Sequence, residues 1–214
     1  MSNFKLVIFD MDGTLIAGRT VFAFAEKKGF KDELLRIINN NNELYKKSIE
    51  IAKLLKGMNS IELLEIFRNI PLQEHVENVI MKIKERGIKT AIVTDSYKFV
   101  ADDLRERLGI DYAFANNLII EKGIVTGELI ISNKDIKKSF NDCKIHSICK
   151  DCVLKSLCEK LDLSENEVIA VGDSAVDICM IKSAGLGIAY NAPKEVQKHA
   201  DINTSNMSVI LKYI

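Results

Sequence analysis

Short apolar runs that end in polar residues alternate along the chain with segments whose apolar residues recur at the helical period. The apolar runs lie at residues 5–10, 90–94 and 168–171, and residues 185–190 form a weaker fourth. Continuous short runs of this kind are typical of strands buried on both faces of a sheet. Helical patterns lie between these runs: Val76, Val79, Ile80 and Ile83 precede the second run, and Val100, Ala101, Leu104 and Leu108 follow it. Alternating strands and helices predict an α/β fold with a doubly wound, mainly parallel sheet.

Residues 16–75 interrupt this alternation. Apolar residues keep the helical period there without a convincing strand, as at Leu44, Ile49, Ala52, Leu55, Ile61, Leu64 and Phe67. We therefore predict a helical insert over residues 16–75, set into an α/β core formed by residues 1–15 and 76–214. Two β-rich arms between residues 118 and 131 flank Lys122 and Gly123, which predicts a hairpin.

Composition and charge narrow the classes of function. The 214 residues are 47% hydrophobic and 28% charged with only 2 prolines, which excludes a disordered chain and favours a folded one. Thirty basic residues balance thirty acidic ones, so we expect neither a general nucleic-acid binder nor a membrane-surface binder. No apolar stretch approaches the ~20 residues that span a bilayer, and no secretory leader pattern opens the chain. We expect a cytoplasmic protein.

Polar clusters follow three of the predicted strands. They read DMDGT at residues 10–14, TDS at 94–96 and GDSAVD at 172–177. Each cluster alone is more typical of a turn or a helix cap, and only their joint occurrence favours a site. Because ligands of open α/β sheets bind beyond the carboxyl ends of the strands, we expect the three clusters to meet at one edge.

The chemistry of these clusters points to a metal and a phosphate. Several carboxylates near one spot repel each other unless a hard cation neutralises them, and oxygen ligands suit Mg²⁺. At a strand end, Asp10 can attack a phosphorus atom, while Asp12 lies two residues further on and can exchange protons.

The chain resembles the haloacid dehalogenase superfamily, and within it the phosphoserine phosphatases. FDMDGTL at residues 9–15 is similar to the first signature of that family, Thr94 to the second, Lys150 to the third and GDSAVD to the fourth. The four signatures also occur along this chain in the same order as in that family. The helical insert lies between the first and second signatures, where those enzymes carry a cap domain.

The resemblance implies a Rossmann-like core and a Mg²⁺-dependent phosphomonoester hydrolase that acts on a small phosphorylated metabolite through an aspartyl-phosphate. It makes Asp10 the nucleophile and Asp12 the general acid and base. The metal ligands it implies are Asp10, the main-chain carbonyl of Asp12, and Asp173, with Asp177 in support. The substrate contacts it implies or leaves open are Thr94, Asp95, Ser96, Lys150 and Arg19.

Arg19 departs from the family in a way that bears on the substrate. Phosphoserine phosphatases carry a glutamate nine residues after the nucleophile for the substrate ammonium group, and here that position is Arg19. They also carry an arginine for the substrate carboxylate, and the aligned residues 48–52 contain none. Like charges in a buried site repel strongly, so an inward Arg19 predicts a substrate with an extra anionic or neutral polar group. An Arg19 side chain in solvent at the edge of the insert would remove that argument.

Five cysteines include three that flank Lys150 together with a histidine, as Cys143, His146, Cys149 and Cys152. Thiolates and imidazole at short spacing are Zn²⁺ ligands in many proteins, so a Zn²⁺ site is one interpretation. The constant three-residue step is not typical of closed zinc sites. Reduced cysteines that pack as small hydrophobic residues are the other interpretation.

Two other functions stay open on the sequence. A phosphomutase or phosphotransferase would use the same aspartyl-phosphate with a different acceptor. A non-catalytic regulatory protein organised around a thiolate-bound metal would need none of the carboxylates, and the presence of Asp10, Asp12, Lys150 and Asp173 argues against it.

Overall fold

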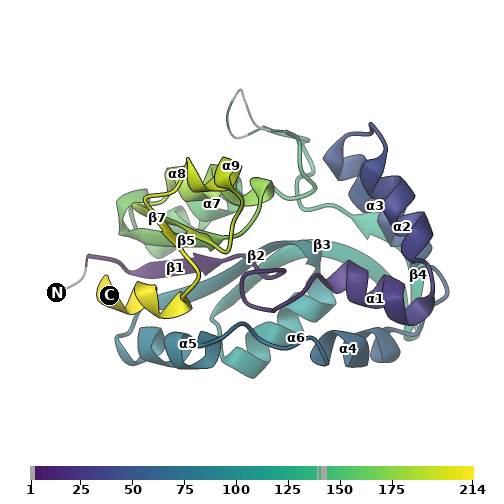
Figure 1. Cartoon of the computed structure of the whole chain (residues 1–214), viewed down its shortest axis with the longest axis horizontal. Coiled ribbons are helices and arrows are strands. Elements are labelled where there is room, and N and C mark those ends of the chain that lie inside the picture. The colour runs from purple at the N-terminus through teal and green to yellow at the C-terminus, as the bar shows by residue number, and fades with distance from the viewer. Residues whose placement is uncertain (1–2, 139, 141–143) are drawn as a thin grey trace.

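A seven-stranded sheet organises the computed structural model, which describes residues 3–138, 140 and 144–214 (Figure 1). The strands are β1 (Leu6–Phe9), β2 (Lys89–Tyr97), β3 (Tyr112–Glu121), β4 (Ile124–Ile130), β5 (Val168–Gly172), β6 (Leu186–Tyr190) and β7 (Ile202–Thr204). Their order across the sheet is β4-β3-β2-β1-β5-β6-β7. Neighbouring strands are parallel except β3 and β4, which form an antiparallel hairpin. The predicted mainly parallel α/β sheet is confirmed.

Helices cover both faces of this sheet. The described chain forms the helices α1 (Thr20–Lys28), α2 (Lys31–Asn39), α3 (Leu44–Leu54), α4 (Ser60–Arg68), α5 (Val76–Glu85), α6 (Lys98–Leu108), α7 (Lys150–Leu161), α8 (Ile178–Ser183) and α9 (Lys194–Gln197). Figure 1 shows α5 and α6 below the sheet and α7 and α8 above it. Within the described part of the chain, every helix is too short or too polar to cross a lipid bilayer.

Strand β1 shows why a continuous apolar run fits this position. Its four residues are fully buried. Successive side chains of a strand point to opposite faces, so Val7 and Phe9 join the core under α5 and α6. The alternate residues Leu6 and Ile8 pack in the second core with Leu154 of α7. A strand that is covered on both sides has no polar face to show in its sequence.

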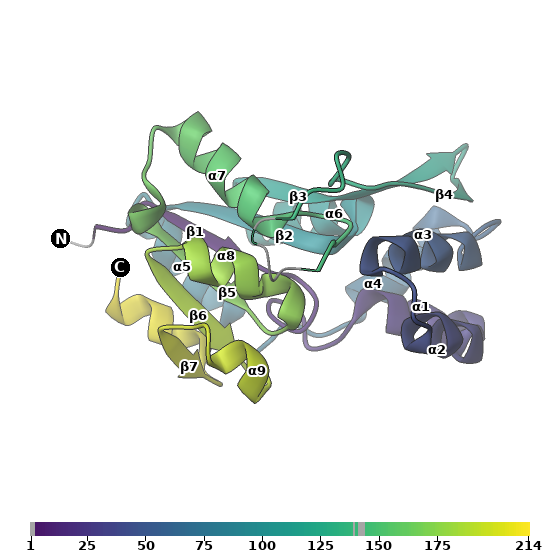
Figure 2. The same ribbon diagram turned by 90° about the horizontal axis from the view of Figure 1, so that it is seen from above.

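Four helices, α1 to α4, occupy the region predicted as a helical insert. Figures 1 and 2 both place them at the end of the molecule where the β3–β4 hairpin lies. The main-chain N–H of Gly57 donates to the carbonyl of Val125 at 2.8 Å, and the N–H of Ser60 donates to that of Gly123 at 2.8 Å. The hairpin therefore ties the insert to the sheet. The described residues 16–75 form no strand beyond isolated bridges, and the domain boundaries at 16 and 75 stay a prediction.

Two strands differ from the expectation. The first arm of the hairpin begins at Tyr112 rather than at residue 118, because residues 112–116 also pair in parallel with β2. The strand β7 has three residues, INT, at the edge of the sheet. Such a short polar strand is defined by its pairing with β6 and leaves no apolar run in the sequence. At the predicted turn, Lys122 and Gly123 have φ values of 50° and 82°, as a tight hairpin requires.

Adjacent leucines of α2 provide a test of how the insert packs. Leu34 is fully buried in the main core, and Leu35 is 37% exposed. We expect Leu34→Ala to lower the free energy of unfolding by about 2–5 kcal/mol, because it leaves a cavity. The matched control Leu35→Ala removes the same atoms from the same helix and should cost less than about 1 kcal/mol. Urea unfolding measures both, and equal losses would contradict the described packing of α2.

Candidate active site

The carboxyl ends of β2, β1 and β5 lie side by side, and one of the polar clusters lies at each end. The cluster at residues 94–96 is part of β2, which continues to Tyr97, and does not follow the strand as the sequence predicted. Phe9 of β1 is level with Ile92 of β2 and with Val171 of β5. The next residue, Asp10, donates its main-chain N–H to the carbonyl of Val171 at 2.9 Å. Because the three strands are parallel neighbours, the clusters at residues 10–14, 94–96 and 172–177 meet at one edge, as the sequence predicted.

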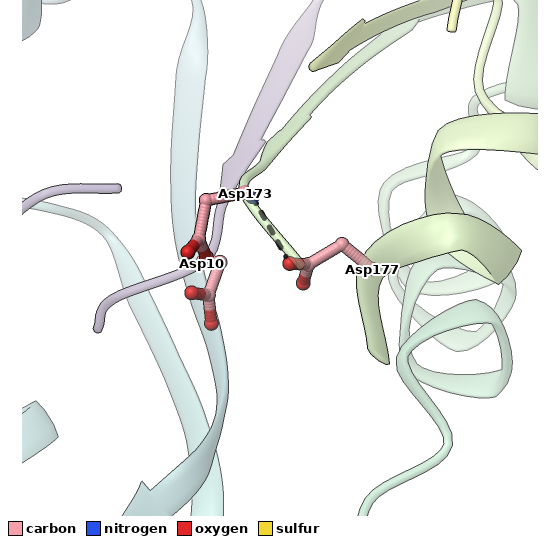
Figure 3. A group of neighbouring side chains, drawn as sticks. All are labelled: Asp10, Asp173 and Asp177. Carbon is pink, nitrogen blue, oxygen red and sulfur yellow. Dashed lines mark hydrogen bonds between the residues drawn. The ribbon is translucent and has the colours of Figure 1, made fainter. Parts of the chain in front are cut away.

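Three carboxyl groups gather at this edge. Asp10, Asp173 and Asp177 each offer an oxygen, and these oxygens lie within 4.8 Å of one another. Figure 3 shows the side chains of Asp10 and Asp173 next to each other and that of Asp177 reaching toward them from the helical side. Asp10 and Asp177 are buried, with 3% and 0% of their surfaces exposed. Burial raises the pKa of Asp10 and of Asp173 above the usual range, and the neighbouring carboxyl groups raise it further, although Lys150 opposes both effects.

Lys150 lies between two of these carboxyl groups. It is the first residue of α7, and its side chain is fully buried. Its Nζ donates to Oδ1 of Asp10 and, at 2.5 Å, to Oδ1 of Asp177. Burial lowers the pKa of Lys150, but the two carboxylates outweigh burial and hold it above its ordinary value. The ammonium group therefore stays charged and offsets part of the negative charge of the cluster.

Asp177 holds the loop that follows β5. Its Oδ2 accepts from the N–H of Asp173 at 3.1 Å, from the N–H of Ser174 at 2.9 Å and from the Ser174 hydroxyl at 3.0 Å. A Cβ at Gly172 would lie 2.4 Å from the Cβ of Asp177. Glycine at the end of β5 is thus needed for this close approach.

The donor set fits a hard divalent cation. The Oδ1 atom of Asp173 is buried and has no hydrogen-bond partner among the residues that the structure describes. A Cβ at Gly13 would lie 2.5 Å from the Oδ2 atom of Asp173, so the glycine keeps the space beside this carboxylate open. An unpaired carboxylate oxygen beside other carboxylates is what Mg²⁺ coordination requires.

Asp12 has an environment unlike that of Asp10. Its Oδ1 accepts from the hydroxyl of Thr20 at 2.5 Å, at the start of α1. Burial raises the pKa of Asp12 to about 7, and the Thr20 hydrogen bond opposes this rise. A carboxyl group whose pKa is close to neutrality suits both donation and acceptance of a proton. The sequence analysis missed Thr20, which in sequence is an ordinary residue at the beginning of a helix.

The end of β2 supplies three further predicted site residues. Thr94 is fully buried, and its hydroxyl accepts from the N–H of Ser96 at 3.2 Å. Asp95 and Ser96 line a cavity next to Asp12. The carbonyl of Asp95 is held by Nδ2 of the buried Asn116 at 2.6 Å. In the sequence, Asn116 is the last residue of the run DYAFAN at residues 111–116, and no role was predicted for it.

The cavity of about 520 Å³ between this edge and the insert contains Arg19 in its wall. The Nη2 atom of Arg19 lies 3.2 Å from Oδ2 of Asp173, and 51% of the Arg19 side chain is exposed. The structure combines features of the two placements considered for Arg19, because its guanidinium group contacts the site while half of the side chain is in solvent. The carboxylate cluster is therefore in contact with a residue from the start of the insert.

The Cys/His segment does not form the proposed zinc site in the described residues. Cys143 lies outside them, and Cys149 and Cys152 are joined in a disulfide with their Cα atoms 5.2 Å apart. The thiolates that a zinc ion would need are thus bonded to each other, and the expectation of reduced cysteines is wrong for this pair. His146 instead lines the cavity, and burial lowers its pKa. Among the described residues, the group suited to a metal is Asp10, Asp173 and Asp177.

Comparison with known proteins agrees with this geometry. A model of the haloacid dehalogenase-like hydrolase family matches residues 4–185. The chain belongs to this family. The fold and the family predicted from the sequence are confirmed, and so is the prediction of a phosphatase-type enzyme over a non-catalytic regulatory protein.

Three members of this haloacid dehalogenase-like family illustrate the similarity. A phosphoserine phosphatase of Archaeoglobus fulgidus is 35% identical over 211 residues, which are 96% of this chain and 58% of the relative. A phosphoserine phosphatase of Methanocaldococcus jannaschii is 30% identical over 220 residues, with coverage of 98% and 97%. A solved structure described as a phospho-aspartyl intermediate analogue of phosphoserine phosphatase has a TM-score of 0.83 at 29% identity and covers 99% of both chains.

The Lys150 bridge gives a stability prediction. Lys150→Met leaves Asp10 and Asp177 buried without their cation, so we expect the free energy of unfolding to fall by about 3–5 kcal/mol. Lys160→Met changes the same side chain at the exposed end of the same helix and should cost less than about 1 kcal/mol. Chemical denaturation in metal-free buffer measures both. Equal stability of Lys150→Met and the parent protein would mean that the bridge does not hold the site.

Proposed function

We propose that this protein is a Mg²⁺-dependent phosphomonoester hydrolase that carries the phosphoryl group on Asp10 and acts on a small phosphorylated metabolite. The observation that carries the proposal is the bridge of Lys150 between Asp10 and Asp177, beside an Oδ1 atom of Asp173 that has no partner in the described part of the chain. Phosphoryl transfer depends mainly on position and on charge neutralisation, and this arrangement supplies both.

In the first step, a carboxylate oxygen of Asp10 attacks the phosphorus atom, and the bond between phosphorus and the alcohol oxygen breaks. Lys150 holds Oδ1 of Asp10 and places its positive charge beside the transferred group. Asp12 donates its proton to the leaving alcohol, for which a pKa of about 7 is well suited. The products of this step are the alcohol and an aspartyl-phosphate on Asp10.

In the second step, water attacks the phosphorus atom and the bond to Asp10 breaks. Asp12, now ionised, takes the proton from the water, which returns both carboxyl groups to their starting states. Bound Mg²⁺ would neutralise negative charge on the phosphoryl oxygens. Asp10, Asp173 and the main-chain carbonyl of Asp12 would hold that ion, with Asp177 fixing the loop around Asp173.

Substrate contacts come from β2 and from the insert. The buried Thr94 hydroxyl has a hydrogen to donate to a phosphoryl oxygen, and Asp95 and Ser96 face the cavity. Arg19 lines the same cavity, paired with Asp173 and half in solvent, and it supplies a cation where the ammonium group of phosphoserine would need a carboxylate. We therefore propose a substrate that has an anionic or neutral polar group where phosphoserine has its ammonium group.

The test is release of inorganic phosphate from a panel of phosphorylated metabolites, with Mg²⁺ and after its chelation. We expect Asp10→Asn to lower kcat/KM on the order of a thousandfold or more, because the carboxamide is a poor nucleophile. Chelation should abolish turnover, and added Mg²⁺ should restore it.

Asp32→Asn is the matched control, because Asp32 is exposed on α2. It should keep the parent activity. Full activity of Asp10→Asn would contradict the proposed nucleophile. Consumption of substrate without release of free phosphate would instead indicate transfer to another acceptor, as in a phosphotransferase.

A further inference from the structure

The wall that the insert gives to the cavity plays no part in the phosphoryl chemistry. Five of its side chains are apolar, namely Val21, Phe22, Ile38, Leu44 and Ile51. The first two belong to α1, and the others come from α2 and α3. Carbon surface of this extent favours a ligand with an apolar body, since burial of apolar groups removes them from water.

The charged side chains of this wall are both cationic. Arg19 is next to the carboxylate cluster, where it pairs with Asp173. Lys47, on α3, is partly buried. Its Nζ donates to the main-chain carbonyl of Ile38 at 2.6 Å. An ammonium group has three donors, so this bond orients Lys47 and leaves two donors for a ligand.

Positive charge continues beyond Lys47. The same lysine lines a neighbouring cavity of about 430 Å³, to which Lys138 and Lys144 also contribute. Glu43, the acidic residue in that second wall, is exposed and pairs with Lys46 at 2.8 Å. The other carboxylate nearby, that of Glu50, accepts from Asn40 and Asn42 in the same wall. The lysines outnumber these two carboxylates, so the region beyond Lys47 is net positive.

The acidic side chains of the main cavity belong to the core. They are Asp12, which follows β1, and Asp95, which lies near the end of β2. None of the described insert residues in the cavity wall is acidic. On the insert side, a substrate ammonium group would thus meet the like charges of Arg19 and Lys47. A substrate anion would instead meet the two remaining N–H donors of Lys47.

We propose that Lys47 is a specificity residue that binds an anionic group at the far end of the substrate, with the carbon body of the substrate packed against the apolar wall. The substrate class is then a phosphomonoester of an apolar hydroxy acid, with the phosphate at Asp10 and the acid group at Lys47. This assignment rests on the proposed hydrolase function and adds to it the chemistry of the leaving group.

A matched set of esters tests the assignment on the full chain with Mg²⁺. The probes are the phosphate monoesters of 6-hydroxyhexanoic acid, hexan-1-ol and 6-aminohexan-1-ol, each with shorter and longer homologues. They differ only in an anionic, neutral or cationic end. We expect kcat/KM to be highest for the acid at the best chain length and lowest for the amine, with about tenfold or more between them.

Substitutions then assign the preference to one side chain. Lys47→Met should remove the advantage of the acid over the hexyl ester by raising KM for the acid about tenfold with kcat unchanged. Lys47→Arg keeps the charge and should keep the preference. Lys53→Met is the matched control, because Lys53 is an exposed lysine of the same helix that lines neither cavity, and it should leave every ester unaffected.

The contradicting outcomes are distinct. An acid preference that persists in Lys47→Met would remove Lys47 from the assignment. A preference for the amine that disappears in Asp95→Asn would show that the core carboxylate, rather than the insert, selects the substrate. If no ester and no p-nitrophenyl phosphate releases phosphate, the hydrolase function itself fails. Hydrolysis of all three esters at equal rates overturns only the role of Lys47.

Discussion

The arrangement of the site depends on the need to neutralise carboxylates that are buried together. A buried charge is costly unless it is paired, and Asp10 and Asp177 share the ammonium group of Lys150. This requirement places the first turn of α7 over the carboxyl ends of β1 and β5. It also explains why β5 ends in Gly172, since any larger residue would push Asp177 away from the lysine.

The sheet topology turns this local constraint into a reaction site. Parallel pairing of β1 with both β2 and β5 brings residues that are far apart in sequence to one edge. The insert then covers that edge and converts it into a cavity with a polar floor and a largely apolar opposite wall. Chemistry and selectivity thus come from different parts of the chain: the core supplies the reacting groups, and the insert meets the rest of the ligand.

The sequence predicted the buried strands and the carboxylates at their ends because both depend on local composition. A strand covered on both faces must be apolar throughout, and Asp10 and Asp173 follow such strands directly. Thr20, Asn116 and the Cys149–Cys152 disulfide could not be predicted, since each depends on a contact that only the tertiary structure makes. For the same reason Lys47 looks in sequence like any surface lysine.

The central claim is that Asp10 carries the phosphoryl group, and the most direct test is to capture the intermediate. The enzyme would be mixed with Mg²⁺ and its best substrate, quenched with acid within the first turnover, digested and analysed by tandem mass spectrometry. We expect a phosphorylated peptide with the phosphate on Asp10, which is absent when Asp10→Asn is treated in the same way. Phosphate on another residue, or a first turnover in which no phosphorylated peptide forms, would contradict it.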